Sequence, residues 1–86
     1  MKIDFHRNFD KRFKKLNTRQ RQQFKIKLTI FTQDQSHPTL NNHGLKGRYA
    51  GYRIINISGD FRAVFIQHTN SHVEFVDIGS HSQLYG

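Results

Sequence analysis

The sequence predicts an α+β domain with the element order β-α-α-β-β-β, in which a small antiparallel sheet carries an N-terminal helical hairpin on one face. Two observations favour this class. Apolar residues recur at helical spacing within the first 34 residues, and three short β-branched and aromatic segments follow residue 51. The 86 residues are expected to form one domain, residues 1–86, whose core draws on eight Phe and three Tyr.

The N-terminal part is expected to contain a strand and a first helix. Residues 2–6 alternate polar and apolar side chains, as a short strand does. Asn8 is the expected N-cap of the helix that follows. The apolar stripe of this helix comprises Phe9, Phe13 and Leu16, and its basic side comprises Lys11, Arg12, Lys14 and Lys15.

A second helix is predicted from about Thr18 to Asp34. Asn17 and Gln20 form a capping-box pattern at its start. Residues 24–31 also alternate as a strand would, but the segment runs without Gly or Pro well beyond ordinary strand length. Phe24, Leu28 and Phe31 are expected to face the sheet, and Ile26 and Ile30 to contact the first helix.

The second half is predicted to hold three strands, over residues 52–57, 61–68 and 72–78. An irregular link over residues 35–51 precedes them, and a short tail over residues 79–86 follows. Simple hairpin pairing places Asn56 opposite Phe61, and Phe61 opposite Gly79. In this register, Asp60, Phe61, Asn56 and the segment that enters His81 would converge at one end of the sheet.

The charge of the chain favours a polyanionic partner. The formal net charge is +8, and residues 1–48 hold 12 of the 14 Lys and Arg but only three of the six acidic residues. A nucleic acid or an acidic protein fits this balance. The absence of cysteine excludes disulfides and a thiolate nucleophile. No apolar run approaches the roughly 20 residues needed to span a bilayer, and the first residues lack a signal-peptide core, so a cytoplasmic protein without membrane contact is expected.

The residue types also suit RNA cleavage by attack of the 2′-OH. That reaction needs a base for the 2′ proton, an acid for the 5′ leaving oxygen and cations for the phosphorane. Histidine can transfer protons near neutral pH, Arg and Lys bind phosphate, and aromatic rings stack on bases. No metal or other cofactor is required, and the six histidines show no metal-ligand spacing.

Three segments carry a resemblance to a known family. Residues 43–53 (HGLKGRYAGYR), 59–65 (GDFRAVF) and 76–85 (VDIGSHSQLY) are similar to motifs of the RelE/ParE superfamily of bacterial toxins, in particular its YafQ-like branch. The resemblance implies a type II toxin that acts as a ribosome-dependent mRNA endoribonuclease. It also implies an acidic antitoxin as partner, with the toxin monomeric alone and hetero-oligomeric with the antitoxin, and contacts to mRNA and to ribosomal RNA at the 30S A site.

The resemblance also assigns roles to individual residues. His43 and His81 match the catalytic histidines, as acid and base in either order, and Asp60 would assist one of them. Phe61 and Tyr85 match aromatic positions expected to stack on bases. The family pattern does not itself supply the cation for the phosphate in this chain, and we expect that charge to come from Lys46, Arg48, Arg53 and Arg62.

Two positions depart from the family pattern. Asn56 stands where a histidine is usual, and Asp77 where an arginine is usual. Asn cannot exchange a proton near pH 7, and Asp77 would repel phosphate. Two alternatives therefore stay open: a ParE-like inhibitor of DNA gyrase, and a catalytically idle relative that binds RNA or protein.

Overall fold

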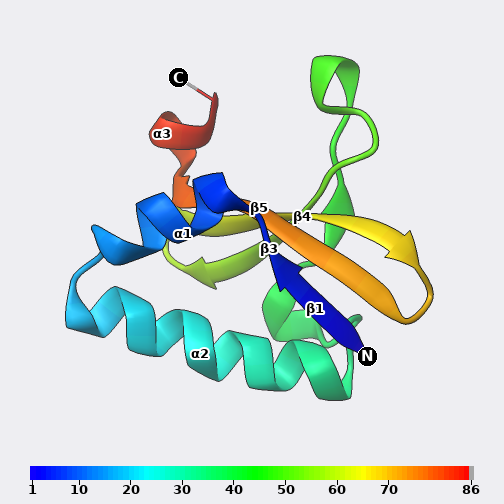
Figure 1. Cartoon of the computed structure of the whole chain (residues 1–86), viewed down its shortest axis with the longest axis horizontal. Coiled ribbons are helices and arrows are strands. Elements are labelled where there is room, and N and C mark those ends of the chain that lie inside the picture. The colour runs from blue at the N-terminus through cyan, green and yellow to red at the C-terminus, as the bar shows by residue number, and fades with distance from the viewer. Residues whose placement is uncertain (86) are drawn as a thin grey trace.

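The computed structural model describes residues 1–85 and confirms the α+β class (Figure 1). Five strands form one sheet in the order β1-β5-β4-β3-β2. The strands are β1 (Lys2–Phe5), β2 (His43–Gly44), β3 (Arg53–Ser58), β4 (Phe61–Thr69) and β5 (His72–Ser80). The helices are α1 (Arg7–Lys14), α2 (Thr18–Gln33) and α3 (His81–Tyr85), with 3-10 turns η1 (Pro38–Leu40) and η2 (Gly47–Tyr49).

The sheet is mixed. The strands β3, β4 and β5 pair antiparallel, as predicted. The short strand β2 falls in the segment predicted to be an irregular link and pairs antiparallel with β3, and β1 lies parallel to β5 at the edge of the sheet. A parallel neighbour requires a long crossover, and almost the whole chain lies between β1 and β5. None of the helices in residues 1–85 combines the length and the hydropathy needed to cross a membrane.

The two long helices begin at different kinds of cap. Asn17 caps α2 through the predicted capping box, with its side chain accepting from Gln20 N at 2.8 Å and the Gln20 side chain accepting from Asn17 N at 3.3 Å. The prediction that Asn8 caps α1 is wrong. His6 is the cap, because its Nδ1 accepts from Asn8 N at 3.0 Å. The Asn8 side chain instead donates to Val76 O at 3.3 Å and ties α1 to β5.

A phenylalanine cluster fills the space between the sheet and the two long helices. Phe75 at its centre is fully buried, and its ring centroid lies 5.4 to 5.9 Å from those of Phe5, Phe9, Phe24, Phe31 and Phe65. Phe24 and Phe31 therefore face the sheet as predicted, and Ile30 packs at the edge of the cluster. Ile26 does not contact α1. Ile26 is 61% exposed. It follows Phe24 by two positions, and this spacing puts it on the opposite side of α2.

The strand register differs from simple hairpin pairing by one residue. An irregularity between Asn56 and Ser58 pairs Asn56 with Arg62 and Ser58 with Phe61, and Arg62 then pairs with Gly79. A shift of one residue moves a side chain to the other face of a sheet. Phe61 consequently enters the core, where it is only 6% exposed, and Arg62 turns to the other face.

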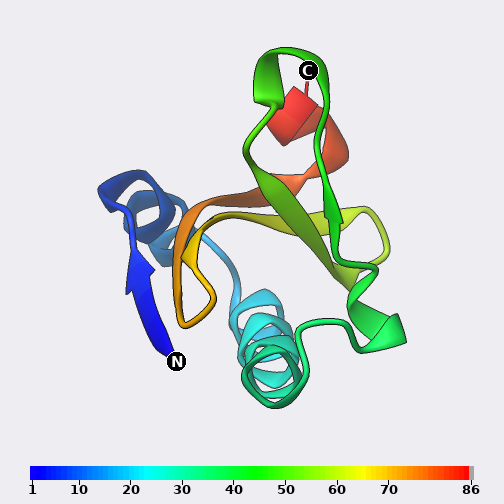
Figure 2. The ribbon, with the colours of Figure 1, turned by 90° about the vertical axis from the view of Figure 1, so that its right-hand side faces the viewer.

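We call the sheet face turned away from α2 the open face. The segment over residues 45–52 and the short helix α3 both rise above it, as Figure 2 shows, while α2 lies beneath the opposite face. Cross-strand pairing places Ile54, Val64 and Asp77 in one row of the open face, and Asn56, Arg62 and Gly79 in the next. These two rows underlie the site described below.

Candidate functional site

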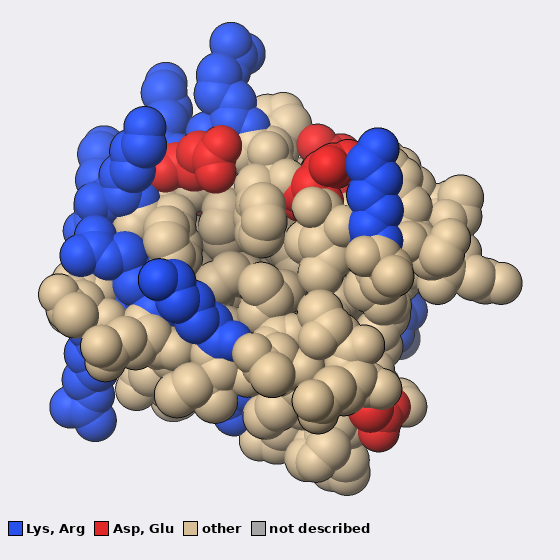
Figure 3. All heavy atoms as spheres, turned by 60° about the horizontal axis from the view of Figure 1, so that its bottom comes forward, with Lys and Arg blue, Asp and Glu red and all other residues tan. Residues whose placement is uncertain are grey.

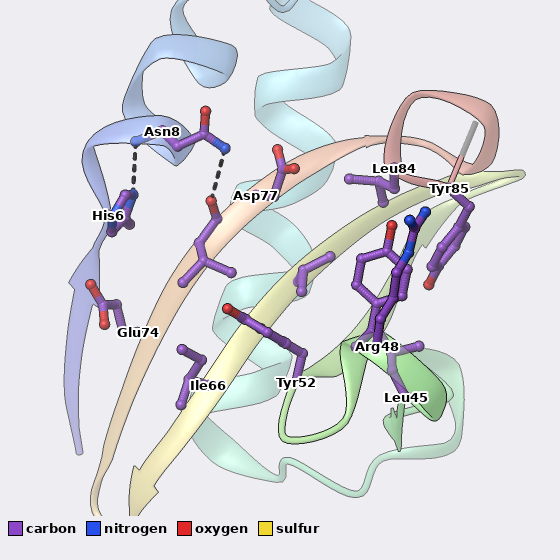
Figure 4. Close-up of a pocket in the computed structure, with 13 residues that line it drawn as sticks. His6, Asn8, Leu45, Arg48, Tyr52, Ile66, Glu74, Asp77, Leu84 and Tyr85 are labelled. Carbon is purple, nitrogen blue, oxygen red and sulfur yellow. Dashed lines mark hydrogen bonds between the residues drawn. The ribbon is translucent and has the colours of Figure 1, made fainter.

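The open face carries a hollow of about 580 Å³ (Figure 4). Val64, Ile66 and Val76 form an apolar floor on β4 and β5. The irregularity in the β4–β5 pairing leaves Val76 without a direct partner, and such a bulge lets Val76 and Asp77 both reach the hollow. The walls come from three segments: His6 and Asn8 at the start of α1, the residues Leu45, Arg48, Tyr49 and Tyr52, and finally Leu84 and Tyr85 of α3.

A second capping box fixes α3 at one end of the hollow. The Gln83 side chain accepts from Ser80 N at 2.8 Å, and Ser80 Oγ accepts from Gln83 N at 3.2 Å. His81, the first residue of α3, donates its backbone N–H to Asp60 O at 2.9 Å. The turn between β3 and β4 thus anchors the residue that carries the imidazole.

Three rings form a continuous series at this end of the hollow. His81 and Tyr85 lie four residues apart on α3, so they share one side of the helix, with ring centroids 4.6 Å apart. Tyr85 in turn meets Tyr49 edge to face, at 5.7 Å and 83°. The guanidinium of Arg48 lies 5.1 Å from the centroid of the Tyr49 ring, within cation–π distance.

Burial raises the pKa of the Tyr85 phenol above its ordinary value, and the neighbouring Tyr49 adds to the rise. The positive charge of Arg62 opposes both effects. Tyr85 therefore keeps its proton at neutral pH. Its hydroxyl is available as a hydrogen-bond donor at the hollow, which Arg48 also lines.

The structure brings together part of the predicted site. Arg48 and Tyr85 line the hollow, His81 contacts the Tyr85 ring, and Asp60 holds His81 through its backbone carbonyl. Arg62 lies on the open face, where its Nη1 donates to the carbonyls of Gly59 and Phe61.

Four of the predicted residues lie elsewhere. The prediction that Phe61 stacks on a base is wrong, because its ring is part of the core. Arg53 donates from Nε to Asn42 Oδ1 at 3.0 Å and lines a different depression. Lys46 is exposed, directly before the turn η2. His43 is exposed, with Nδ1 2.7 Å from Asn41 O, and is outside the lining of the hollow.

His43 and His81, the two predicted catalytic histidines, are therefore not in contact with each other in the described part of the chain. The pairing of His43 with Ile54 still places His43 on the open face, one strand beyond the floor of the hollow. His81 stands at the other side of that floor, on α3. A ligand that contacts both would have to extend across the open face.

The sequence analysis missed several residues of the site. Tyr49 and Tyr52 line the hollow, although only their place within the motif GRYAGYR pointed to them. Arg12 was expected on an outer basic side of the first helix, yet its Nε lies 3.1 Å from Asp77 Oδ1. Asp77 is thus paired with a cation. Asn56 keeps a buried Oδ1 that has no hydrogen-bond partner within the described residues.

The described residues contain no group of three His, Cys, Asp or Glu side chains arranged to hold a metal ion. Histidines do approach acids at the far end of the open face. His72 lies 2.8 Å from Asp4 and His68 lies 3.0 Å from Glu74, with the two imidazole centroids 4.8 Å apart. These pairs lie at the β4–β5 turn, away from α3.

Comparison with known proteins identifies the family. The model of a family described as the bacterial toxin of type II toxin-antitoxin systems, YafQ, matches residues 1–86. The chain belongs to the YafQ family. It is thus a type II toxin by family, and its fold is the one shared by YafQ and related toxins. No curated protein matches the sequence.

Solved structures of other toxins share the fold of this YafQ-family chain. YafQ from E. coli superimposes with a TM-score of 0.82 at 20% identity, over 98% of this chain and 97% of that one. YafQ in the E. coli DinJ-YafQ toxin-antitoxin complex gives 0.79 at 22% identity, over 98% and 96%. A YoeB/ParE toxin from Agrobacterium tumefaciens gives 0.77 at 16% identity, over 94% and 99%.

Proposed function

We propose that this YafQ-family toxin is a ribosome-dependent mRNA endoribonuclease that cleaves by metal-independent attack of the 2′-OH. The observation that carries the proposal is the series His81–Tyr85–Tyr49 at the end of a hollow lined by aromatic and cationic side chains. A proton-transfer group, base-stacking rings and guanidinium groups are what RNA transesterification requires. The strongly basic balance of the chain supports an RNA substrate.

In this mechanism the 2′ oxygen attacks the adjacent phosphorus and loses its proton to a base, while the bond from phosphorus to the 5′ oxygen breaks and that oxygen gains a proton from an acid. The products are a 2′,3′-cyclic phosphate and a 5′-hydroxyl. His81 is one of the two proton-transfer groups, as acid or as base, because its imidazole lies beside Tyr85 at the hollow. His43 is the other proton-transfer group. It can take this role because the bound mRNA would extend across the open face from α3 towards β2.

Tyr85 and Tyr49 take the role of base-stacking residues, since both rings border the hollow. Arg48 and Arg62 bring positive charge close to these rings. Asp60 assists by holding the first turn of α3. Lys46 and Arg53 lie farther along the loop and strand and contact the outer parts of the RNA.

The basic residues around the connection between α1 and α2 supply a second contact, to ribosomal RNA. Lys14, Lys15 and Arg19 surround this connection in the sequence, and Figure 3 shows Lys and Arg side chains gathered at this end of the helical face. Phosphate contacts of this kind weaken steeply with salt. An acidic antitoxin would compete for the same charge, in line with the complex of E. coli YafQ with DinJ. A cytoplasmic location is part of this proposal, because ribosomes and mRNA are found there.

Induction of the chain in a bacterium, followed by mapping of mRNA ends, tests the proposal. Codon-aligned cuts are expected from the wild-type chain and are expected to disappear with His81→Ala. His68→Ala is the matched control, because it removes an exposed imidazole at the other end of the open face. DNA damage with intact mRNA would instead indicate inhibition of gyrase, and the absence of any phenotype would indicate a catalytically idle relative.

A further inference from the structure

The two sides of the hollow differ in the polar groups that they offer. The side next to α3 is aromatic and cationic and carries the proposed chemistry. We call the opposite side, which lies next to α1, the α1 side (Figure 4). It is lined by His6, Asn8, Glu74 and Asp77. The proposed function gives these residues no role, although a ligand that fills the hollow would contact both sides.

Asp77 offers the α1 side one carboxylate oxygen that is open to a ligand. Its Oδ1 accepts from Ile78 N at 2.9 Å and lies 3.1 Å from Arg12 Nε. Its Oδ2 has no hydrogen-bond partner among residues 1–85. The Asp77 side chain is 24% exposed and lines the hollow, so Oδ2 can accept a hydrogen bond from a bound molecule.

Asn8 adds a second acceptor beside Asp77. Its Nδ2 donates to the carbonyl of Val76, the residue directly before Asp77, at 3.3 Å. With Nδ2 used in this way, Oδ1 remains as an acceptor, and it has no partner in the described part of the chain. Glu74 differs from both, because its Oε1 lies 3.0 Å from His68 Nε2.

The rest of the hollow suits a flat apolar ring. The floor consists of Val64, Ile66 and Val76, and Tyr52 adds an aromatic ring to the lining. The volume of about 580 Å³ lies within the range of sites for small molecules. A nucleobase can rest its face on such a floor and turn its polar edge to the α1 side.

The acceptors on the α1 side distinguish between bases. Guanine presents two N–H donors next to each other on its Watson–Crick edge, at N1 and at the 2-amino group. Adenine, cytosine and uracil each place an acceptor beside their donor on that edge, and such an acceptor would repel an oxygen of Asp77 or Asn8. Neighbouring acceptors without a donor between them therefore favour guanine.

We propose that the α1 side of the hollow binds a guanine base of the RNA, with Asp77 Oδ2 and Asn8 Oδ1 accepting from its Watson–Crick edge. This subsite rests on the proposed function and deepens it, because it names the base that the hollow selects. The ion pair with Arg12 offsets the charge of Asp77, so the carboxylate can lie close to an anionic RNA.

The ratio of affinities for two bases separates base recognition from simple repulsion. A carboxylate that only repelled RNA would weaken binding of every sequence alike, so Asp77→Asn would tighten all of them and leave the ratio unchanged. A carboxylate that accepts from guanine acts on the ratio itself. The Asn amide both donates and accepts, so it would fit adenine as well as guanine.

Fluorescence anisotropy with labelled trinucleotides tests the subsite. Each trinucleotide carries guanine or adenine between two uridines and 2′-O-methyl groups at every position, so it lacks the nucleophile and cannot be cleaved. The wild-type chain is expected to bind the guanine form about tenfold more tightly, the effect of one hydrogen bond to a charged group. Asp77→Asn is expected to reduce this preference to about twofold or less.

Two control variants separate the carboxylate from its charge and from its ion pair. Asp10→Asn makes the same change at an exposed position of α1 outside the hollow and is expected to keep the preference. Arg12→Gln breaks the ion pair but leaves the carboxylate, so it is expected to weaken both trinucleotides alike and keep the preference. Loss of the preference in either control would overturn the role of Asp77.

The wild-type measurement tests the subsite even if Asp77→Asn fails to fold. Equal binding of the two trinucleotides, no binding of either, or a full preference in folded Asp77→Asn would each overturn the subsite. The nuclease proposal is tested separately by mRNA mapping. Guanine preference without mRNA cleavage supports the subsite and removes the nuclease, whereas mRNA cleavage without guanine preference leaves the nuclease and removes the subsite.

Discussion

The two faces of the sheet divide the aromatic residues of this chain by type. All eight Phe belong to the helix-covered side, where they form the ring cluster around Phe75 or pack beside it. All three Tyr, namely Tyr49, Tyr52 and Tyr85, line the hollow of the open face. A Phe ring can be buried completely without cost, whereas a phenol needs a partner for its hydroxyl.

The difference between the two faces suggests that the covered face serves stability and the open face serves function. The covered face is built from Phe rings that contact one another, so substitutions there are expected to act on folding. The open face combines the same kind of ring area with hydroxyl, imidazole and guanidinium groups that remain open to a ligand. Substitutions there are expected to act on RNA, with small effects on folding.

Phe75→Ala provides the largest contrast. Phe75 is fully buried and meets five other rings, so its truncation is expected to lower the free energy of unfolding by about 3 to 5 kcal/mol. Denaturant unfolding is the measurement. Tyr49→Ala on the open face is the comparison and is expected to cost about 1 kcal/mol. Equal losses for the two variants would contradict the division between the faces.

Tyr85 tests the role of ring area on the open face. Tyr85→Ala is expected to weaken binding of a non-cleavable RNA by about 1 to 3 kcal/mol, the range for loss of one base-stacking ring. Tyr85→Phe keeps the ring and is expected to bind nearly as wild type. Anisotropy titrations report both variants. A loss as large for Tyr85→Phe as for Tyr85→Ala would assign the effect to the hydroxyl rather than to stacking.

The two capping boxes sharpen the comparison, because they have the same chemistry on different helices. Asn17→Ala removes the cap of the sixteen-residue helix α2 and is expected to lower stability by about 1 kcal/mol. Ser80→Ala loosens the five-residue helix α3 and is expected to reduce RNA cleavage more than stability. Thermal unfolding and mRNA mapping of these two variants show whether each cap acts on stability or on RNA cleavage. An activity defect confined to Asn17→Ala would reverse the assignment.

The pKa of Tyr85 gives the smallest expected effect. Because burial raises this pKa, the folded state binds the phenolic proton more tightly than the unfolded state, whose value is 10.0. The associated stabilisation is complete below pH 10.0 and is lost as the pH rises through the folded pKa. Arg62→Gln is expected to raise the pKa further, and Tyr49→Phe to lower it. NMR of ¹³C-labelled tyrosine resolves the Tyr85 titration, and a lower pKa in Arg62→Gln would show that its charge acts elsewhere.

The sequence by itself determined the elements that depend on neighbouring residues. The capping box at Asn17, the sheet-facing Phe24 and Phe31 and the three consecutive strands follow from local patterns, and the structure confirms them. The motif around residues 76–85 also pointed to the right family, which the match over residues 1–86 confirms. Tyr85, which the same motif singled out for base stacking, borders the hollow, and its role stays a prediction.

Only the tertiary structure decided which of these residues share a site. An irregularity in β3 moved Phe61 into the core and turned Arg62 to the open face, and no local pattern signals such a shift of register. The contact of Arg12 with Asp77 joins α1 to the last strand and depends on how the helix lies on the sheet. Periodicity and caps are set by neighbours along the chain, whereas a site on a sheet is set by pairing between segments that lie far apart in sequence.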